Sequence, residues 1–345
     1  MSGDPILAID AMGGDDAPAV VIEGLARFCR RRDDVAFHLH GDEAKVSAAL
    51  RDAPEVATRS EIIHADGSVR MDEKPSQALR TARGTSMWNA IEAVKEGTAD
   101  AAVSAGNTGA LMAMSMLRLR KMRGVHRPGM TAFWPTVNGV SVILDVGANL
   151  EADASQLVTF AIMGEAFARA LMGIENPTVG ILNIGSEETK GHDEVREAAA
   201  ILSAGEFGMN YVGFIEGDDI SMGAVDVVVT DGFTGNVAIK TAEGTARMFT
   251  HFLRNAFSSG PIAKLGALAV ANGMSEMRDK LNPSNSNGAV LLGLNGIVVK
   301  AHGGSEPDGY ANAVNVAMNL VGGHYLEGVA DGLARLTDRE KPAAE

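Results

Sequence analysis

The sequence predicts an α/β fold in which helices cover a mostly parallel β-sheet. Strand-like and helix-like segments alternate along most of the 345 residues, which is the rhythm of βαβ units. Residues 178–182 (TVGIL) are apolar and uncharged, without alternation, a pattern typical of a strand buried on both faces. The chain also holds 40 glycines and only 5% aromatic residues, a composition that suits many tight turns between strands and helices.

The first part of the chain opens with a strand at residues 6–10, the turn AMGGDDAP and a helix at residues 17–31. Gly13 and Gly14 permit the tight turn, and Pro18 suits the first turn of the helix. The same alternation continues through strands at 36–39, 62–65 and 101–104, and through helices after Asp42, at 84–96 and at 110–121.

The second part contains a hairpin, further alternating elements and a pair of long helices. Strands are predicted at 131–135, 140–145, 178–182, 211–215, 225–230 and 297–301, with helices at 155–172, 193–202, 237–257, 262–281 and 310–326. The breaker SSGP at 258–261 turns two of these helices into an αα-hairpin. We expect residues 1–338 to form a single α/β unit, with a frayed charged tail at 339–345.

Composition narrows the class of protein. The net charge of −14 argues against general nucleic-acid binding through a basic face. The single cysteine, Cys29, excludes an internal disulfide framework and fits a reducing compartment. The N-terminus lacks a signal-peptide pattern, and no apolar run reaches the roughly 20 residues that span a bilayer. We therefore expect a cytoplasmic protein.

Several catalytic motifs are absent from the sequence. It contains no Gly-x-Gly, and hence no dinucleotide fingerprint, no GxxxxGK[ST], no nucleophile elbow and no HExxH. The eight histidines are scattered, so no metal and no cofactor is expected.

Six loops of small polar residues follow the predicted strands, at residues 10–15, 104–109, 145–149, 185–191, 231–236 and 302–305. Ligands bind at the carboxyl ends of strands in open α/β sheets, and parallel strands end on one side, so the loops are expected to converge. Together they offer backbone N–H groups and the charges of Lys190, Lys300 and His302, which suit a phosphate and a developing oxyanion. Each loop alone is equally compatible with an ordinary turn.

At these loops the sequence resembles a known family. The blocks AIDAMGGDDAP, SAGNTGALMA, LDVGAN, LNIGSEETKG, VDVVVTDGFTGNV and LLGLNGIVVKAHG, between residue 8 and about residue 305, are similar to the signature blocks of the bacterial PlsX family. The resemblance implies a three-layer fold like that of phosphate acetyltransferases and isocitrate/isopropylmalate dehydrogenases, with a protruding helical hairpin.

The same resemblance implies the activity of an acyl-ACP:phosphate acyltransferase of phospholipid synthesis. A fatty acyl group passes from acyl carrier protein to inorganic phosphate, and a membrane acyltransferase uses the acyl phosphate to acylate glycerol 3-phosphate. Phosphate is already an anionic nucleophile, and a thioester supplies the activated acyl group, so orientation and charge neutralisation matter most.

The family blocks point to two catalytic residues. Lys190 is expected to neutralise the phosphate or the oxyanion, and Asn236, expected to open its helix, to donate an amide N–H. The residues assigned to phosphate or acyl binding are Asp10, Gly13, Gly14, Asp15, Asn107, Thr108, Asp145, Asn149, Gly185, Ser186, Asp231, Thr234, Gly235, Lys300 and His302.

Two surfaces are expected to meet partners. Acyl carrier protein is acidic, and the most basic run of the chain, 118–129, offers Arg118, Arg120, Lys121, Arg123 and Arg127 as a docking face; these charges also suit a helix C-terminus. The hairpin at 237–282 is linked by the resemblance to homodimer formation and to peripheral membrane contact.

Two other functions remain open. A CoA-dependent phosphate acetyl- or butyryltransferase would share fold and chemistry, and a non-catalytic scaffold would gather acyl carrier protein at the membrane. A dehydrogenase is disfavoured because the loops carry no obvious carboxylate cluster for a divalent metal.

Overall fold

One continuous eleven-stranded sheet organises the computed structural model of the chain, which describes residues 4–339 except 206, 272 and 274–287. The strand order is β3-β2-β1-β4-β11-β10-β5-β6-β9-β7-β8. The strands are β1 (Ile6–Asp10), β2 (Ala36–Gly41), β3 (Ser60–His64), β4 (Ala101–Ser104), β5 (Gly129–Thr136), β6 (Gly139–Leu144), β7 (Thr178–Leu182), β8 (Asn210–Ile215), β9 (Val227–Val229), β10 (Ala289–Leu292) and β11 (Ile297–Lys300).

Two parallel halves make up this sheet. Strands β3, β2, β1, β4 and β11 pair in parallel, as do β6, β9, β7 and β8. Between the halves the pairing is antiparallel at β11–β10, β10–β5 and β5–β6. These three reversals give the two halves opposite strand senses, so the expectation that all strand ends lie on one side of the sheet is wrong.

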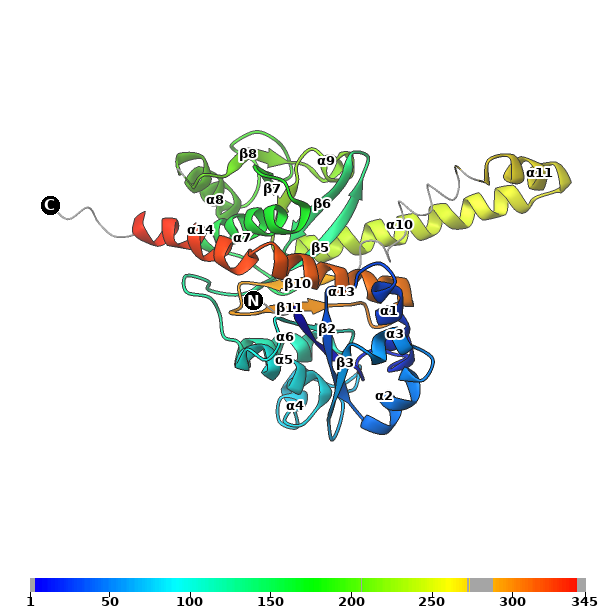
Figure 1. Cartoon of the computed structure of the whole chain (residues 1–345). Helices are drawn as coiled ribbons and strands as arrows, with labels where there is room; N and C mark the ends of the chain where they lie inside the picture. The colour runs from blue at the N-terminus through cyan, green and yellow to red at the C-terminus, as the bar shows by residue number, and fades with distance from the viewer. Residues whose placement is uncertain (1–3, 206, 272, 274–287, 340–345) are drawn as a thin grey trace.

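Helices cover both faces of the sheet (Figure 1). The helices in the described residues are α1 (Ala19–Cys29), α2 (Glu43–Leu50), α3 (Pro54–Ala57), α4 (Pro75–Ala78), α5 (Ser86–Glu96), α6 (Thr108–Arg118), α7 (Ala154–Met172), α8 (Asp193–Ala204), α9 (Gly217–Met222), α10 (Gly232–Ser258), α11 (Pro261–Ala269), α13 (Pro307–Gly322) and α14 (Tyr325–Arg339). In the first half, Leu7 and Ile9 pack in a core with α1 and α13, while Ala8 between them packs with α5 and α6. This alternation produces the predicted three-layer α/β fold.

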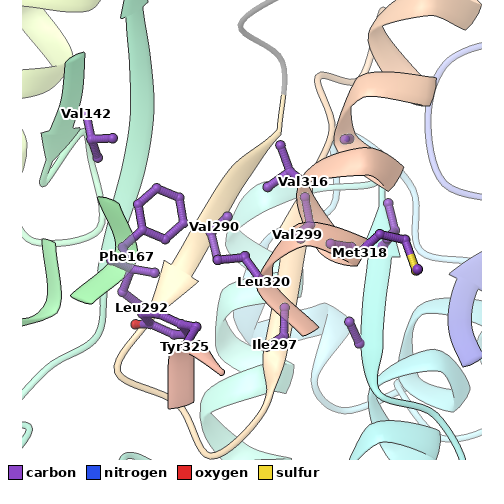
Figure 2. Packing of buried hydrophobic residues seen from close by; sticks show 14 of the residues in the cluster. Val142, Phe167, Val290, Leu292, Ile297, Val299, Val316, Met318, Leu320 and Tyr325 are labelled. Carbon is purple, nitrogen blue, oxygen red and sulfur yellow. The ribbon is translucent and has the colours of Figure 1, made fainter. Parts of the chain in front are cut away.

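The largest core continues from one half of the sheet to the other. Figure 2 shows Phe167 of α7 and Tyr325 of α14 beside Leu292 of β10, and their rings meet edge to face with centroids 6.0 Å apart. Phe167 and Tyr325 are fully buried. The two halves therefore share one hydrophobic interior instead of joining through a polar seam.

Helices α10 and α11 form an arm that projects from the body (Figure 1). Helix α11 begins at Pro261, the last residue of the predicted break, and ends at Ala269; residues 272 and 274–281 of the predicted second helix lie outside the described residues. None of the helices in the described part of the chain is both long and apolar enough to cross a membrane.

Some boundaries differ from the predictions. Helix α10 begins at Gly232, five residues before the predicted start, because Asp231 caps it and overrides the weak helix propensity of the glycines that follow. The predicted closing helix ends at Gly322, and a separate helix, α14, runs through Arg339; residues 340–345 of the predicted tail lie outside the described residues. Strand β10 and the short helices α3, α4 and α9 were not predicted.

Candidate active site

Asp10 is a buried carboxylate at the carboxyl end of β1, in the first half of the sheet. Asp10 is 1% exposed, and its Oδ2 accepts a 2.6 Å hydrogen bond from the Ser104 hydroxyl at the end of β4. Its Oδ1 accepts no hydrogen bond from any residue that the structure describes. Burial raises the pKa of the Asp10 carboxyl, and nearby donors and the positive charge of Lys300 only partly oppose that rise.

The loops after β1 and β4 close tightly on this carboxylate. A Cβ on Gly13 would lie 2.5 Å from Asp10 Oδ2, and one on Gly106 would lie 2.6 Å from Met87 Cε. Gly14 has a φ of +109°, in the left-handed region that favours glycine. Gly13 and Gly14 therefore let the loops approach each other, and a direct role of either in binding stays a prediction.

The other predicted residues of these two loops hold neighbouring segments in place. The Asp15 N–H donates to the Gly303 carbonyl at 3.0 Å, which ties the first loop to the loop after β11. Asn107 caps α6, and its side-chain amide donates to three carbonyl groups in residues 70–73. Thr108 begins α6 directly after that cap.

Lys300 ends β11 as a buried cation. It is 6% exposed, and its ammonium donates to the carbonyl oxygens of Ala105, at 3.3 Å, and of Ala301. Burial lowers the pKa of Lys300 to about 8, against the opposing effect of the negative charges of Asp10 and Asp15. Close by, the Nδ1 atom of His302 accepts a hydrogen bond from the Gly304 N–H.

The second half of the sheet carries its own buried carboxylate, Asp145, directly after β6. Asp145 is fully buried, and its two oxygens accept five hydrogen bonds. The donors are the N–H groups of Met130, Gly147, Ala148 and Asn149 and the side-chain amide of Asn149. With its acceptor capacity used in this way, Asp145 shapes the loop at 145–149.

The first turn of α10 packs against that loop. Asp231 caps the helix by accepting hydrogen bonds from the Thr234 N–H at 2.8 Å and the Thr234 hydroxyl at 2.7 Å. A Cβ on Gly235 would lie only 1.9 Å from the Asp145 carbonyl oxygen. Glycine at position 235 is therefore required by the close approach of the helix to the loop.

The sequence predicts that Asn236 opens its helix, and this prediction is wrong. It is the fifth residue of α10, which starts at Gly232, and backbone N–H groups at that depth are engaged within the helix. Its side-chain amide donates to the Val146 carbonyl at 3.1 Å. Asn236 joins α10 to the loop after β6, and its catalytic role stays a prediction.

Lys190 lies in the loop between β7 and α8. The loop is held by Asn183, whose amide donates to the Lys190 carbonyl at 3.2 Å and whose Oδ1 leaves no room for a Cβ on Gly191. In this loop Gly185 is buried, whereas Ser186 and Lys190 are exposed. Among the described residues no carboxylate lies within 4 Å of the Lys190 ammonium.

A cleft of about 3700 Å³ brings several of these loops together. The predicted residues that line it are Thr108, Asp231, Thr234, Asn236, Lys300 and His302. The predicted residues that do not line it are Asp10, Gly13, Gly14, Asp15, Asn107, Asp145, Asn149, Gly185, Ser186, Lys190 and Gly235. The loop of Lys190 reaches the cleft through Gly191 and His192.

Residues from both halves of the sheet thus border one cleft despite their opposite strand senses. Five of the six predicted loops contribute to it, and no residue of the loop at 10–15 lines it. Within residues 4–339, apart from the gaps, no group of three His, Cys, Asp or Glu side chains could hold a metal ion.

The basic run at 118–127 is partly engaged in internal contacts. Arg118 hydrogen-bonds Glu92 with both ends of its guanidinium, which lies 4.9 Å from the centroid of the Trp88 ring. Lys121 donates to the His126 carbonyl. The remaining three predicted docking residues are exposed: Arg120, Arg123 and Arg127.

Two sets of residues were missed by the sequence reasoning. One is the buried polar pair Ser104, which hydrogen-bonds Asp10, and His40, the register partner of Asp10 on β2. Ser104 lies in the predicted loop at 104–109 but was not named as a site residue, and a polar residue that ends an otherwise apolar strand was the available signal. The other is an apolar rim of the cleft, formed by exposed side chains that no periodicity distinguishes from ordinary surface positions: Leu150, Ile184, Phe233 and Val237.

Comparison with known proteins shows to which protein family the chain is similar. Residues 6–327 match a family model described as "Fatty acid synthesis protein". The chain is 54% identical over 337 residues to a phosphate acyltransferase of Caulobacter vibrioides, covering 98% of this chain and 94% of that protein. It is 52% identical over 323 residues to a phosphate acyltransferase of Mesorhizobium japonicum, covering 93% and 91%.

Solved structures with a similar fold are more distant in sequence. A EutD phosphotransacetylase from Staphylococcus aureus and a phosphotransacetylase from Streptococcus pyogenes each superpose with a TM-score of 0.62 at 16% identity. Each match covers 92% of this chain and 94% of the other. These two likenesses confirm the phosphate acetyltransferase-like fold. Because the family model spans most of the chain and the curated relatives share about half of its residues, the chain belongs to the PlsX family of phosphate acyltransferases.

Proposed function

We propose that this protein transfers a long-chain fatty acyl group from acyl carrier protein to inorganic phosphate, giving an acyl phosphate for phospholipid synthesis. The proposal is supported by the names of its relatives and, in the structure, by one observation above all. The same cleft offers cationic and polar groups at strand ends and an uncovered apolar rim, which are the two chemistries that phosphate and a fatty acyl chain require.

The apolar rim supports a long acyl group. Leu150 and Ile184 are 76% and 78% exposed, and Phe233 and Val237 are 61% and 50% exposed, although all four line the cleft. Large apolar side chains left open beside a cleft mark ligand-binding grooves. The cleft also continues along α10, where the apolar side chains of Ile239, Phe249 and Leu253 line it.

The polar part of the cleft supports attack by phosphate on a thioester. In this reaction a phosphate oxygen forms a bond to the acyl carbonyl carbon, the carbon–sulfur bond breaks, and the phosphate proton leaves on the carrier thiol. Charge develops on the carbonyl oxygen during the attack, and donors fixed in advance lower that barrier most. Lys190 is proposed to neutralise the phosphate or the oxyanion, and Asn236 to present an amide group to the same centre.

The test is phosphate-dependent formation of acyl phosphate from palmitoyl-acyl carrier protein. Lys190→Ala is expected to lower kcat/KM by about 10- to 100-fold, the value of one charge-assisted contact. Lys45→Ala, at an exposed lysine of α2, is the matched control and should match the wild type. Full activity of Lys190→Ala would contradict the role of Lys190, and a preference for acetyl-CoA would favour a CoA-dependent phosphate acetyltransferase.

We also propose that acyl carrier protein docks on the exposed arginines of the run at 118–127. The partner is acidic, and complementary charges raise the rate of encounter. Charge reversal at Arg120 and Arg123 should raise the KM for acyl carrier protein and leave the phosphate KM unchanged. Reversal at Arg51, an exposed arginine after α2, serves as the control, and an unchanged carrier KM in the first variant would eliminate this face.

We further propose that the arm mediates homodimer formation and peripheral contact with the membrane, where a glycerol-3-phosphate acyltransferase would receive the product. Helix α10 exposes Met248, Phe249 and Phe252 at 54%, 50% and 60%, an apolar surface that favours such contacts. Sedimentation equilibrium and vesicle flotation of Phe249→Ser/Phe252→Ser against wild type test the two roles separately. A dimer and vesicle binding both unaffected would refute them.

A further inference from the structure

A row of buried polar side chains crosses four neighbouring strands behind the cleft. His40 of β2 is the register partner of Asp10 of β1, Ser104 of β4 hydrogen-bonds Asp10 at 2.6 Å, and Lys300 of β11 is the register partner of Ser104. The exposed fractions of the four side chains are 2%, 1%, 2% and 6%. Of the four, Lys300 alone lines the cleft.

The loops beside this row are built to keep it in place. The Ser104 hydroxyl donates to Asp10 and accepts a 3.0 Å hydrogen bond from the Gly106 N–H. The closeness of Gly13 and Gly106 to the Asp10 carboxylate excludes any side chain there. Burying a charge costs free energy unless polar groups or an opposite charge compensate it. The fixed position of the Asp10 carboxylate therefore favours a defined position for the Lys300 ammonium at the end of β11.

The contacts of Lys300 leave it suited to an anion. Its ammonium has three donor hydrogens, and the hydrogen bonds assigned to it go to the carbonyl oxygens of Ala105 and Ala301. Among the described residues no carboxylate lies within 4 Å of it. Lys300 lines the cleft, and only distant carboxylates offset its positive charge. Its ammonium can therefore still attract an anion that binds in the cleft.

We propose that Lys300 is the cation that binds inorganic phosphate in the cleft, and that Asp10, held by Ser104, is a positioning residue that keeps the Lys300 ammonium charged. This inference rests on the proposed function and deepens it by assigning the phosphate subsite to the first half of the sheet. Lys190, exposed on its loop, is then left to act on the acyl carbonyl side.

The charged groups around Lys300 agree with this assignment. Burial lowers the pKa of Lys300 to about 8, and Asp10 of β1 and Asp15 of the following loop oppose the decrease. In α13, burial and the negative charge of Asp10 raise the pKa of the Tyr310 hydroxyl. Strand β10 presents only apolar side chains, and Arg118, the charged residue of α6, pairs with Glu92.

His40, at the far end of the row, adds no positive charge at neutral pH. Burial and the neighbouring His38 lower its pKa to about 4. Asp10 is therefore the nearest charge within the row that can act on Lys300. Removing that charge should let the Lys300 ammonium lose its proton at a lower pH.

The first experiment measures binding of inorganic phosphate by titration calorimetry with no acyl donor present. Lys300→Met, which keeps the side-chain length, should weaken phosphate binding by about 10- to 100-fold, and Lys300→Arg should recover part of it. Lys45→Met is the surface control. Unchanged affinity in Lys300→Met, checked for folding by circular dichroism, would overturn the proposal.

The second experiment separates positioning from mere structure. The alkaline limb of kcat/KM for phosphate should lie near pH 8 in the wild type, and Asp10→Asn should move it to lower pH by about one unit. A limb that stays in place would refute the role of Asp10. A protein that binds phosphate through Lys300 yet forms no acyl phosphate would refute the proposed function and support this inference.

Discussion

Two buried aspartates, one in each half of the sheet, are used in opposite ways. Asp10 follows β1 and Asp145 follows β6, and both are essentially inaccessible to solvent. Asp145 accepts five hydrogen bonds, four of them from backbone N–H groups. Asp10 accepts a side-chain hydrogen bond from Ser104 on one oxygen, and burial raises its pKa.

The difference shows that a buried aspartate can either fix the backbone around it or shift the pKa of a neighbouring group. A carboxylate with its acceptor capacity filled fixes the backbone that surrounds it, as Asp145 fixes the loop at 145–149. A carboxylate with spare capacity in a buried position acts at a distance through its charge, as Asp10 acts on Lys300. The predictions below test this contrast.

Removal of the saturated carboxylate should have the largest effect on stability. Asp145→Ala would leave five donors without their acceptor in the interior, and we expect a loss of about 3–5 kcal/mol in the free energy of unfolding. Urea denaturation followed by circular dichroism measures it. A loss no greater than that of Asp10→Ala in the same assay would contradict the contrast.

A methyl group at the contact between α10 and the loop of Asp145 should cost about 1–3 kcal/mol. The Cβ of Gly235→Ala would lie 1.9 Å from the Asp145 carbonyl oxygen. Gly244→Ala, in the same helix with open space around its Cβ, is the matched control and should be neutral or stabilising. Equal melting temperatures for the two variants would show that the loop moves aside.

The pH dependence of stability should reveal the raised pKa of Asp10. Burial raises the folded-state pKa of Asp10 above its ordinary value, so the folded protein binds a proton more readily than the unfolded chain. The contribution of Asp10 to stability therefore falls as pH rises from about 4 through the folded-state pKa. The stability of wild type relative to Asp10→Asn should increase from pH 7 to pH 4.5, and a constant difference would exclude the shift.

The smallest effect is expected at the exposed lysine. Lys190→Ala should change the free energy of unfolding by less than about 0.5 kcal/mol, because no described carboxylate lies within 4 Å of its ammonium. Thermal unfolding of Lys190→Ala beside Lys300→Met measures the two lysines together. A marked loss of stability in Lys190→Ala would show that the Lys190 side chain stabilises the loop between β7 and α8.

Much of the fold could be predicted locally. The apolar runs that became β1, β4, β7 and β9 lack alternation because helices cover both sides of the sheet, and glycine-rich turns follow them. The start of α10 was misplaced because Gly232 and Gly235 weaken its helical pattern, while the Asp231 cap that fixes the start became evident from its bonds to Thr234.

The candidate site was predicted only in part. The sequence identified the loops with Lys300 and His302, because polar residues at strand ends stand out against apolar strands, and the resemblance to the family added Thr234 and Asn236. The family blocks ranked Lys190 above Lys300, but they could not show that Lys300 is buried at the cleft and Lys190 exposed, because burial depends on packing.

Composition, periodicity and the family blocks were therefore enough to establish an α/β protein of the PlsX family and the order of most of its elements. Only the tertiary structure decided that the two halves of the sheet run in opposite senses and that Asp10, Ser104 and Lys300 form one row. Ser104 lies 94 residues from Asp10 and Lys300 lies 195 residues from Ala105. Strand pairing sets such neighbours across the sheet, and a one-residue change of register would turn each side chain to the other face.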